Sequence, residues 1–396
     1  MNDVIVLGAG PAGSRVAHKL ATQGHSVLVL EEHPQIGLPP HCAGIVSKEC
    51  FDLFGLPKES IQRELRAVRL FPPQGEPFRV QKDAVQAYAV DRPRFDLLMA
   101  KQAQGAGASY LLGEKAQEIE VTGKGARVRT SSGATFEGRA AVIAAGFGSA
   151  LTARLGLGEG KEYVIGAQTE VAAPGLEEME VFFGRERAPG FFAWLIPTTP
   201  GKGRAGLFTT RQPRHYLESF LQFLAEKGKA QVNGGDVAYG GVLLRPLSRT
   251  SGDRVLVIGD AAGQVKPTTG GGVYLSLLCA DLAAEALHRA LQSGDLSSRS
   301  LSSYDRLWKD KLGSELRIGY YARRVYEHFD DRGIERVFAL LRKGKMGQSL
   351  ANQKDFSFDW HASTILKALG SEALGAALGP ARSFFAGLRL WPLGRS

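Results

Sequence analysis

Residues 4–13 read Val4-Ile5-Val6-Leu7-Gly8-Ala9-Gly10-Pro11-Ala12-Gly13, and this stretch decides how the first part of the chain folds. An apolar run leads directly into glycines spaced Gly-x-Gly-x-x-Gly, and residues 14–20 have a helical pattern. In such a unit the first glycine makes the turn, the second lets a diphosphate approach the backbone, and the third lets the helix pack on the strand. Glu31 ends the next apolar run, where the ribose-binding acid is expected. We predict a dinucleotide-binding βαβ unit.

A second glycine-rich segment lies far along the chain. Residues 255–263 read Val-Leu-Val-Ile-Gly-Asp-Ala-Ala-Gly, and the triplet Gly270-Gly271-Gly272 follows. Asp260 comes directly after a strand-like apolar run, so its carboxylate is placed to accept hydrogen bonds from the hydroxyls of a polyol. The turn at residues 261–263 brings backbone N–H groups toward a phosphate. We predict that the two distant segments hold one flavin nucleotide.

Three more segments complete the pattern. Residues 40–44 read Pro-His-Cys-Ala-Gly, residues 90–96 read Val-Asp-Arg-Pro-Arg-Phe-Asp, and residues 192–197 read Phe-Ala-Trp-Leu-Ile-Pro. With the two glycine segments, they give a sequence that resembles the geranylgeranyl reductase family, within the para-hydroxybenzoate hydroxylase-like group of flavoproteins. The resemblance covers nearly the whole chain.

The resemblance implies a role for each of these segments. Arg92 is expected near the cofactor, residues 40–44 beside the isoalloxazine ring, and residues 192–197 around an apolar pocket for a prenyl chain. Phe192 stands where the family usually has tyrosine, Ile196 where it has phenylalanine, and Ala43 replaces a glycine. The pocket stays apolar with these changes, and the preferred chain length is left open.

The candidate site residues fall into three groups. Cys42 and His41 are the candidates for catalysis, with the proton donor left open between them, a tyrosine and water. Cys50 and Cys279 are expected to be packing residues, and the cysteine spacing gives no zinc framework, so no metal site is expected. The residues expected to bind FAD are Gly8, Gly10, Pro11, Ala12, Gly13, Glu31, Cys42, Ala43, Arg92, Gly146, Asp260, Gly270, Gly271 and Gly272, and those expected to bind substrate are Phe192, Trp194, Ile196 and Pro197.

The fold class expected is α/β (α+β). Residues 95–106 are expected to be helical, and residues 119–136 resemble a β-meander. Alternating stretches between residues 163 and 245 indicate an antiparallel sheet, and from residue 301 apolar and charged residues recur at helical spacing. We therefore expect a Rossmann-like FAD-binding domain with an inserted antiparallel β-sheet substrate domain and a helical C-terminal lobe. The expected boundaries are 1–60, 90–160 and 246–300 for the discontinuous FAD-binding domain, 61–89 and 161–245 for the substrate-binding domain, and 301–396 for the lobe.

Composition narrows the class of protein and its location. The chain has 396 residues, a formal net charge of +9 and only three cysteines, which is typical of a reducing compartment. No apolar run reaches the roughly 18 residues that span a bilayer, and no signal peptide is expected ahead of a fingerprint at residue 4. No basic run is interleaved with aromatic stacking residues, so no nucleic-acid partner is expected. We expect a cytoplasmic protein.

The end of the chain has an unusual composition. Residues 381–395 contain three arginines, no acidic residue and several large apolar residues, including Phe384, Phe385 and Trp391. This composition is typical of a segment that lies at a membrane interface, which predicts peripheral membrane contact. A terminal helix packed on the body of the protein is the competing interpretation, and both stay open.

The expected chemistry is reduction of the isolated double bonds of a prenyl chain. Reduced FAD supplies hydride from N5, and an apolar pocket lets the chain slide between successive double bonds. No second nucleotide fingerprint is present, so the reductant is left open between NADPH, NADH and a ferredoxin-type electron donor protein. Related hydroxylases carry an Asp-Gly pair that residues 144–149 lack. An FAD-dependent monooxygenase or halogenase is the alternative, followed by a non-catalytic flavin-containing protein that binds prenyl lipid.

Overall fold

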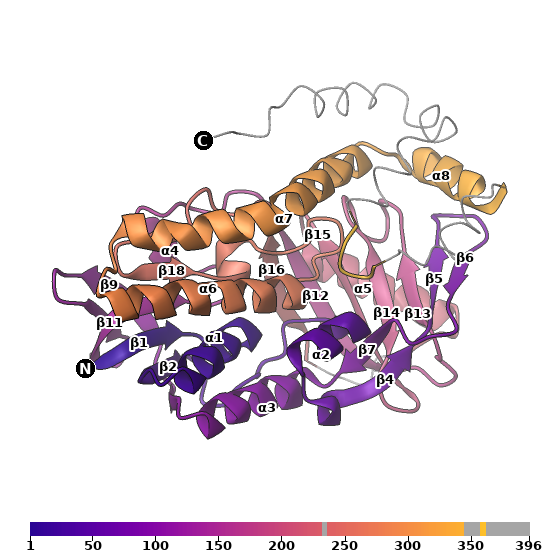
Figure 1. Cartoon of the computed structure of the whole chain (residues 1–396). Helices are drawn as coiled ribbons and strands as arrows, with labels where there is room; N and C mark the ends of the chain where they lie inside the picture. Colours follow the sequence, from indigo (N-terminus) through magenta and orange to yellow (C-terminus); the bar gives the residue numbers. More distant parts are fainter. Residues whose placement is uncertain (232–235, 344–356, 362–396) are drawn as a thin grey trace. The chain divides into compact units, whose positions relative to one another are not determined.

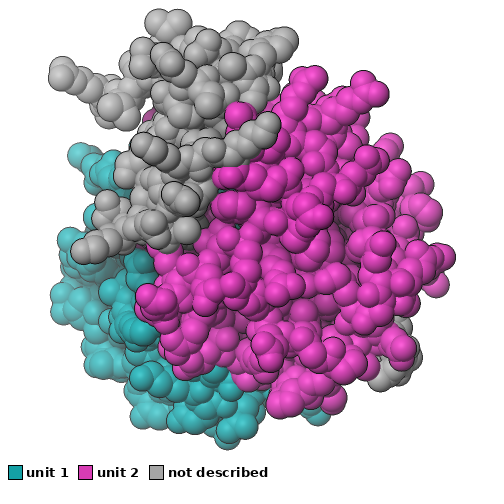
Figure 2. Space-filling model, turned by 90° about the vertical axis from the view of Figure 1, so that its right-hand side faces the viewer, with its two compact units in different colours: residues 1–61, 90–164, 240–316 teal, residues 62–89, 165–239, 317–396 magenta. Residues whose placement is uncertain are grey.

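The computed structural model describes residues 1–231, 236–343 and 357–361. The chain divides into two compact units, which Figure 2 colours separately. Unit 1 consists of residues 1–61, 90–164 and 240–316, and unit 2 consists of residues 62–89, 165–239 and 317–396. The tail at residues 381–395 lies outside the described residues. The division of cofactor and substrate binding between domains therefore stays a prediction.

A mainly parallel sheet is the centre of unit 1. β1 (Asn2–Leu7) lies between β2 (Val27–Glu31) and β11 (Thr135–Ile143) and is parallel to both strands. The helix α1 (Pro11–Thr22) connects β1 to β2. The predicted βαβ unit is thus confirmed. In spatial order the sheet contains β17 (Ser251–Gly252), β18 (Val255–Val257), β11 (Thr135–Ile143), β1 (Asn2–Leu7), β2 (Val27–Glu31) and β8 (Ser109–Leu112).

Both faces of this sheet are buried along residues 4–7, which explains why this part of β1 is apolar. Ile5 and Leu7 pack in a cluster with Ile143 and Val257, whereas Val4 and Val6 point to the opposite face. Beside the sheet, α1 packs against α3 (Arg92–Gly105) and α6 (Val273–Ser293), as Figure 1 shows. The sequence places the start of α3 near Phe95, but the helix begins earlier because Asp91 caps it and accepts the N–H of Arg94 at 3.0 Å.

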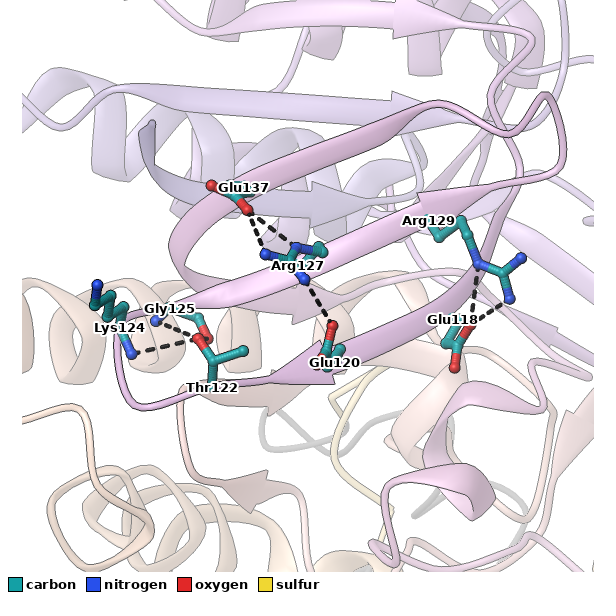
Figure 3. Close-up of polar contacts among 8 residues, drawn as sticks. All are labelled: Glu118, Glu120, Thr122, Lys124, Gly125, Arg127, Arg129 and Glu137. Atoms are coloured by element: carbon teal, nitrogen blue, oxygen red, sulfur yellow. Dashed lines mark hydrogen bonds and ion pairs between the residues drawn. The ribbon is translucent and has the colours of Figure 1, made fainter.

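An antiparallel meander extends from the outer part of β11. It consists of β9 (Ala116–Val121), β10 (Ala126–Thr130) and β11, in agreement with the prediction for residues 119–136. Figure 3 shows that Arg127 lies between Glu120 and Glu137, while Arg129 pairs with Glu118. Such exposed pairs add little stability, but charged residues on an outer strand oppose pairing with another chain.

An antiparallel sheet dominates unit 2, as the sequence predicts. β12 pairs with β15, β15 with β14 and β14 with β13, all antiparallel, and the hairpin of β5 and β6 joins β13 through a parallel pairing. α5 (Pro213–Glu226) packs on one face of this sheet through Leu217, Phe220 and Leu224. The strands are β12 (Tyr163–Ala172), β15 (Lys202–Thr209), β14 (Ala193–Pro197), β13 (Met179–Phe182), β5 (Ala67–Phe71) and β6 (Phe78–Gln81).

Two helices make up most of the described chain after residue 296. α7 (Ser298–Glu327) begins in unit 1 and ends in unit 2, and α8 (Asp331–Lys343) is fixed to the β5–β6 turn by Glu335, which accepts backbone N–H groups at 2.7 and 2.9 Å. Among the described helices, none has the length and apolar character needed to cross a membrane. The short elements are β3 (Ile45–Ser47), α2 (Lys48–Phe54), β4 (Ile61–Leu65), β7 (Ala87–Val90), α4 (Leu151–Arg154), β16 (Ala238–Leu243), and 3₁₀ helices at Lys58–Ser60 and Gly259–Ala262.

Candidate functional site

The turn between β1 and α1 requires each of its three glycines for a different reason. Gly8 has a φ of +106°, and a Cβ there would lie 2.4 Å from the carbonyl oxygen of Ala144. A Cβ on Gly13 would lie 1.9 Å from the carbonyl oxygen of Gly8, so α1 approaches the turn too closely for a side chain. A Cβ on Gly10 would meet nothing within 4 Å. The turn, the helix packing and the open approach that a diphosphate needs are therefore all present.

The N-terminus of α1 is suited to bind an anion. Gly10 is its N-cap, no side chain caps it, and Pro11 occupies the first turn without an acidic residue. In contrast, α2 and α3 are capped by Ser47 and Asp91. The first N–H groups of α1 are left for a ligand, as in other diphosphate sites.

Glu31 is held rigidly at the end of β2. Its Oε2 accepts the N–H of Ala9 at 2.7 Å, and its Oε1 accepts the N–H of His33 at 3.1 Å and lies 2.6 Å from Nδ1 of the same histidine. The contact with Ala9 places the carboxylate directly beside the glycine turn. Carboxylate oxygens accept more than one hydrogen bond, so Glu31 can still bind a ribose hydroxyl.

Asp260 lies at the second predicted segment, in the 3₁₀ helix after β18. A Cβ on Gly272 would lie only 2.7 Å from Oδ1 of Asp260. Gly272 is the N-cap residue of α6, and no side chain caps this helix. Burial raises the pKa of Asp260 to about 6, although the charge of Arg92 opposes this rise. Within the described ranges, no hydrogen bond reaches the carboxylate. A largely desolvated carboxylate without a protein partner fits a site for ligand hydroxyls.

Arg92 connects several of the predicted site residues. Its guanidinium makes hydrogen bonds of 3.1 and 2.9 Å to Asp96 and also bonds to Cys42. Burial lowers the pKa of Arg92, but the charge of Asp96 and the hydrogen bonds to Asp96 and Cys42 outweigh this effect and raise the pKa well above its ordinary range. Because Arg92 also acts on Asp260, three segments that are distant in sequence form one charged group in unit 1.

The remaining predicted cofactor residues lie on loops of the same unit. His41 is exposed and Cys42 and Ala43 are half-buried, and a Cβ on Gly240 of β16 would come within 3.2 Å of the His41 Cβ. Gly146 follows β11 in a left-handed conformation, and Gly271 lies against the side chain of Lys266. Cys50 and Cys279 are fully buried, as expected of packing residues.

Two of the predicted substrate residues, Trp194 and Ile196, share one face of the unit 2 sheet. Ala193 and Leu195 of β14 pack in the cluster under α5, so Trp194 and Ile196 point to the opposite face. Ring centroids of Phe192 and Phe208 lie 6.3 and 5.3 Å from that of Trp194. The indole Nε1 is buried without a hydrogen-bond partner among the described residues. Pro197 ends the strand and is also buried.

Two buried polar residues near Asp260 escape sequence-based reasoning. Gln264 and Tyr304 are both fully buried and hydrogen-bond to each other at 2.8 Å. Neither belongs to a motif, and a tyrosine in an amphipathic helix is ordinarily a packing residue. The only hint in the sequence is that Gln264 is a polar residue in the mainly apolar stretch 255–265.

Sequence comparisons agree with this geometry. Residues 1–307 match the family described as FAD binding domain. The chain is 35% identical to digeranylgeranylglycerophospholipid reductase 2 of Methanothermobacter thermautotrophicus, over 86% of this chain and 91% of the relative. It is 31% identical to the digeranylgeranylglycerophospholipid reductase of Methanocaldococcus jannaschii, over 88% of this chain and 92% of the relative.

Solved structures show the same fold. A geranylgeranyl bacteriochlorophyll reductase-like protein from Thermoplasma acidophilum matches with a TM-score of 0.83 at 21% identity, over 97% of this chain and 99% of that protein. The halogenase PltM matches with a TM-score of 0.69 at 17% identity, over 98% of this chain and 86% of that protein. At these identities the likeness concerns the fold alone.

The fold, the glycine turn and the family match define an FAD-dependent oxidoreductase. The glycine turn, the free N-terminus of α1 and the unpartnered Asp260 carboxylate all fit this cofactor. The chain belongs to the FAD binding domain family and, within it, to the geranylgeranyl reductase family.

Proposed function

We propose that this chain reduces the carbon–carbon double bonds of a prenyl chain carried by an isoprenoid lipid. The relatives that it matches over most of their length are named as reductases of digeranylgeranylglycerophospholipid. That shared name supports a prenylated lipid as the substrate class. The head group and the number of double bonds reduced stay open.

The apolar face of the unit 2 sheet is the observation that carries the proposal. Trp194 is in register with Val181, Val181 with Leu70, and Leu70 with Phe78. Residues in register share a face, so these four side chains form an apolar row across four adjacent strands, about 14 Å long at the usual strand spacing. A hydrocarbon chain on this row would gain about 0.8 kcal/mol per buried methylene without directional contacts. It would be free to slide between successive double bonds.

The residues of unit 1 divide the work of holding the cofactor. Reduced FAD supplies hydride when it is bound. Gly10 and the N-terminus of α1 hold the diphosphate, Glu31 holds a ribose, and Asp260 accepts a hydrogen bond from a polyol hydroxyl. Cys42, whose sulfur is hydrogen-bonded to Arg92, is the first candidate to donate the proton that the second carbon needs, and His41 is the other.

Two finer points are proposed from the sequence. The reductant is a nicotinamide nucleotide, NADPH or NADH, or a ferredoxin-type protein. Peripheral contact with a membrane follows from the lipid character of the substrate and the interfacial composition of residues 381–395.

Product analysis tests the proposed reaction. Chemically reduced protein is incubated without oxygen with a geranylgeranyl lipid, and the lipid is analysed by mass spectrometry. We expect a gain of two hydrogens for each double bond reduced, and no change in a fully saturated lipid used as the control. Products that gain oxygen or halogen, and form only when oxygen is admitted, would favour a monooxygenase or halogenase. The structural likeness to a halogenase lies at 17% identity and does not itself support that reaction.

A further inference from the structure

The turn that carries Asp260 is closed by Gln264. The side-chain Oε1 of Gln264 accepts the N–H of Gly259 at 2.8 Å, and its backbone N–H donates to the carbonyl oxygen of Gly259 at 3.1 Å. These two bonds join the residue before Asp260 to a residue four positions after it. Gly259 and Gln264 are both fully buried, so water does not compete for the bonds.

Tyr304 of α7 holds this turn from behind. Its hydroxyl accepts a hydrogen bond from Nε2 of Gln264 at 2.8 Å and donates one to the carbonyl oxygen of Val257 at 3.2 Å. Val257 is the last residue of β18, immediately before the turn. A single hydroxyl group therefore links both ends of the segment that presents Asp260.

The surroundings leave the turn little freedom to adopt another position. Gly259 has a φ of +67°, and a Cβ there would come within 3.2 Å of the Cβ of Ala12 and 3.3 Å of Oγ of Ser276. The turn thus lies against both α1 and α6, and the N-termini of both helices lack a side-chain cap. The hydrogen bonds of Gln264 and Tyr304 therefore hold the backbone on both sides of Asp260.

We propose that Gln264 and Tyr304 are positioning residues for the flavin, acting through Asp260. They hold the aspartate turn in the conformation that binds the cofactor, so part of α7 sets the affinity for FAD. The inference rests on the proposed role of Asp260 as a cofactor ligand.

Titration of the apoprotein with FAD tests the inference, because the readout is binding and not catalysis. Tyr304→Phe keeps the ring and removes only the hydroxyl, and we expect it to weaken FAD binding about tenfold. Gln264→Met keeps the length of the side chain and should have a similar effect, which provides a second variant if one of the two fails to fold. Tyr326→Phe is the matched control, because it also removes only a hydroxyl group from α7, and Tyr326 donates to the carbonyl oxygen of Phe191 at 2.7 Å in unit 2, not to the aspartate turn. It should lower thermal stability and leave the FAD affinity unchanged.

A double mutant separates positioning from general stability. If Tyr304 acts through Asp260, adding Tyr304→Phe to Asp260→Asn should weaken FAD binding no further than Asp260→Asn alone. Fully additive losses, or a Tyr304→Phe protein that loses thermal stability with unchanged FAD affinity, would overturn the inference. Unchanged affinity in Asp260→Asn would also overturn it, whereas the reductase activity is judged separately from the mass of the lipid product.

Discussion

The Asp260 carboxylate is held where its charge is costly. Burial raises its pKa from 3.8 to about 6, so the folded apoprotein favours the protonated form only below about pH 6. An acid with a raised pKa in the folded state stabilises that state most below its unfolded pKa, and this contribution is lost as the pH rises through about 6. Residues that lower stability in this way are commonly retained for binding or catalysis.

We expect Asp260→Asn to stabilise the apoprotein in a pH-dependent manner. At pH 8 the variant should gain about 1–2 kcal/mol over the parent protein, a reduced estimate because the side chain is partly exposed. Near pH 4 that gain should disappear, because the parent carboxyl group is then largely neutral. Urea unfolding of both apoproteins at the two pH values measures the difference. An equal difference at both pH values would show that Asp260 is not desolvated.

At the level of the element, β14 carries two different surfaces. Leu195 faces α5 and belongs to the structural core, while Trp194 faces the apolar row that we assign to the prenyl chain. Because successive side chains of a strand point to opposite faces, neighbouring residues of β14 serve the structural core and the proposed substrate surface in turn. Because all five residues of β14 are buried, burial alone does not distinguish the two roles.

A pair of substitutions on β14 distinguishes the two faces. Trp194→Ala and Leu195→Ala each leave a cavity and should each cost about 3 kcal/mol of stability. Only Trp194→Ala should raise KM for a prenyl lipid, by at least tenfold, because it also removes part of the proposed binding surface. FAD content should stay near that of the parent protein in both variants. Steady-state kinetics with flavin absorbance provides both readings, and equal effects on KM would place Trp194 in the structural core.

Local sequence patterns predicted those elements whose signals are contiguous. The glycine turn at residues 8–13 and the meander around residues 119–136 are each encoded within a short stretch, and both are confirmed. The sequence pattern predicts a start of α3 near Phe95, whereas the helix begins at Arg92 because Asp91 caps it. Boundaries of helices depend on such single side chains.

At the level of the whole molecule, the sequence could not reveal which distant residues meet. Tyr304 lies 40 positions from Gln264, and Arg92 joins Cys42 and Asp260 across three segments. Such contacts depend on how α7 and α3 pack, and a buried tyrosine or arginine carries no local signature of its partner. The resemblance to a family supplied Arg92 and Cys42 as site residues, but only the structure links them to Asp260.

FAD bound to this chain should transfer its electrons to a prenyl double bond. The most direct measurement follows the flavin absorbance of the reduced protein, without oxygen, after addition of a geranylgeranyl lipid. We predict that the absorbance of oxidised flavin returns and that the amount of FAD reoxidised equals the amount of double bonds reduced. The saturated lipid should cause no change. Flavin that stays reduced with every prenyl lipid, and is reoxidised only when oxygen is admitted, would contradict the account.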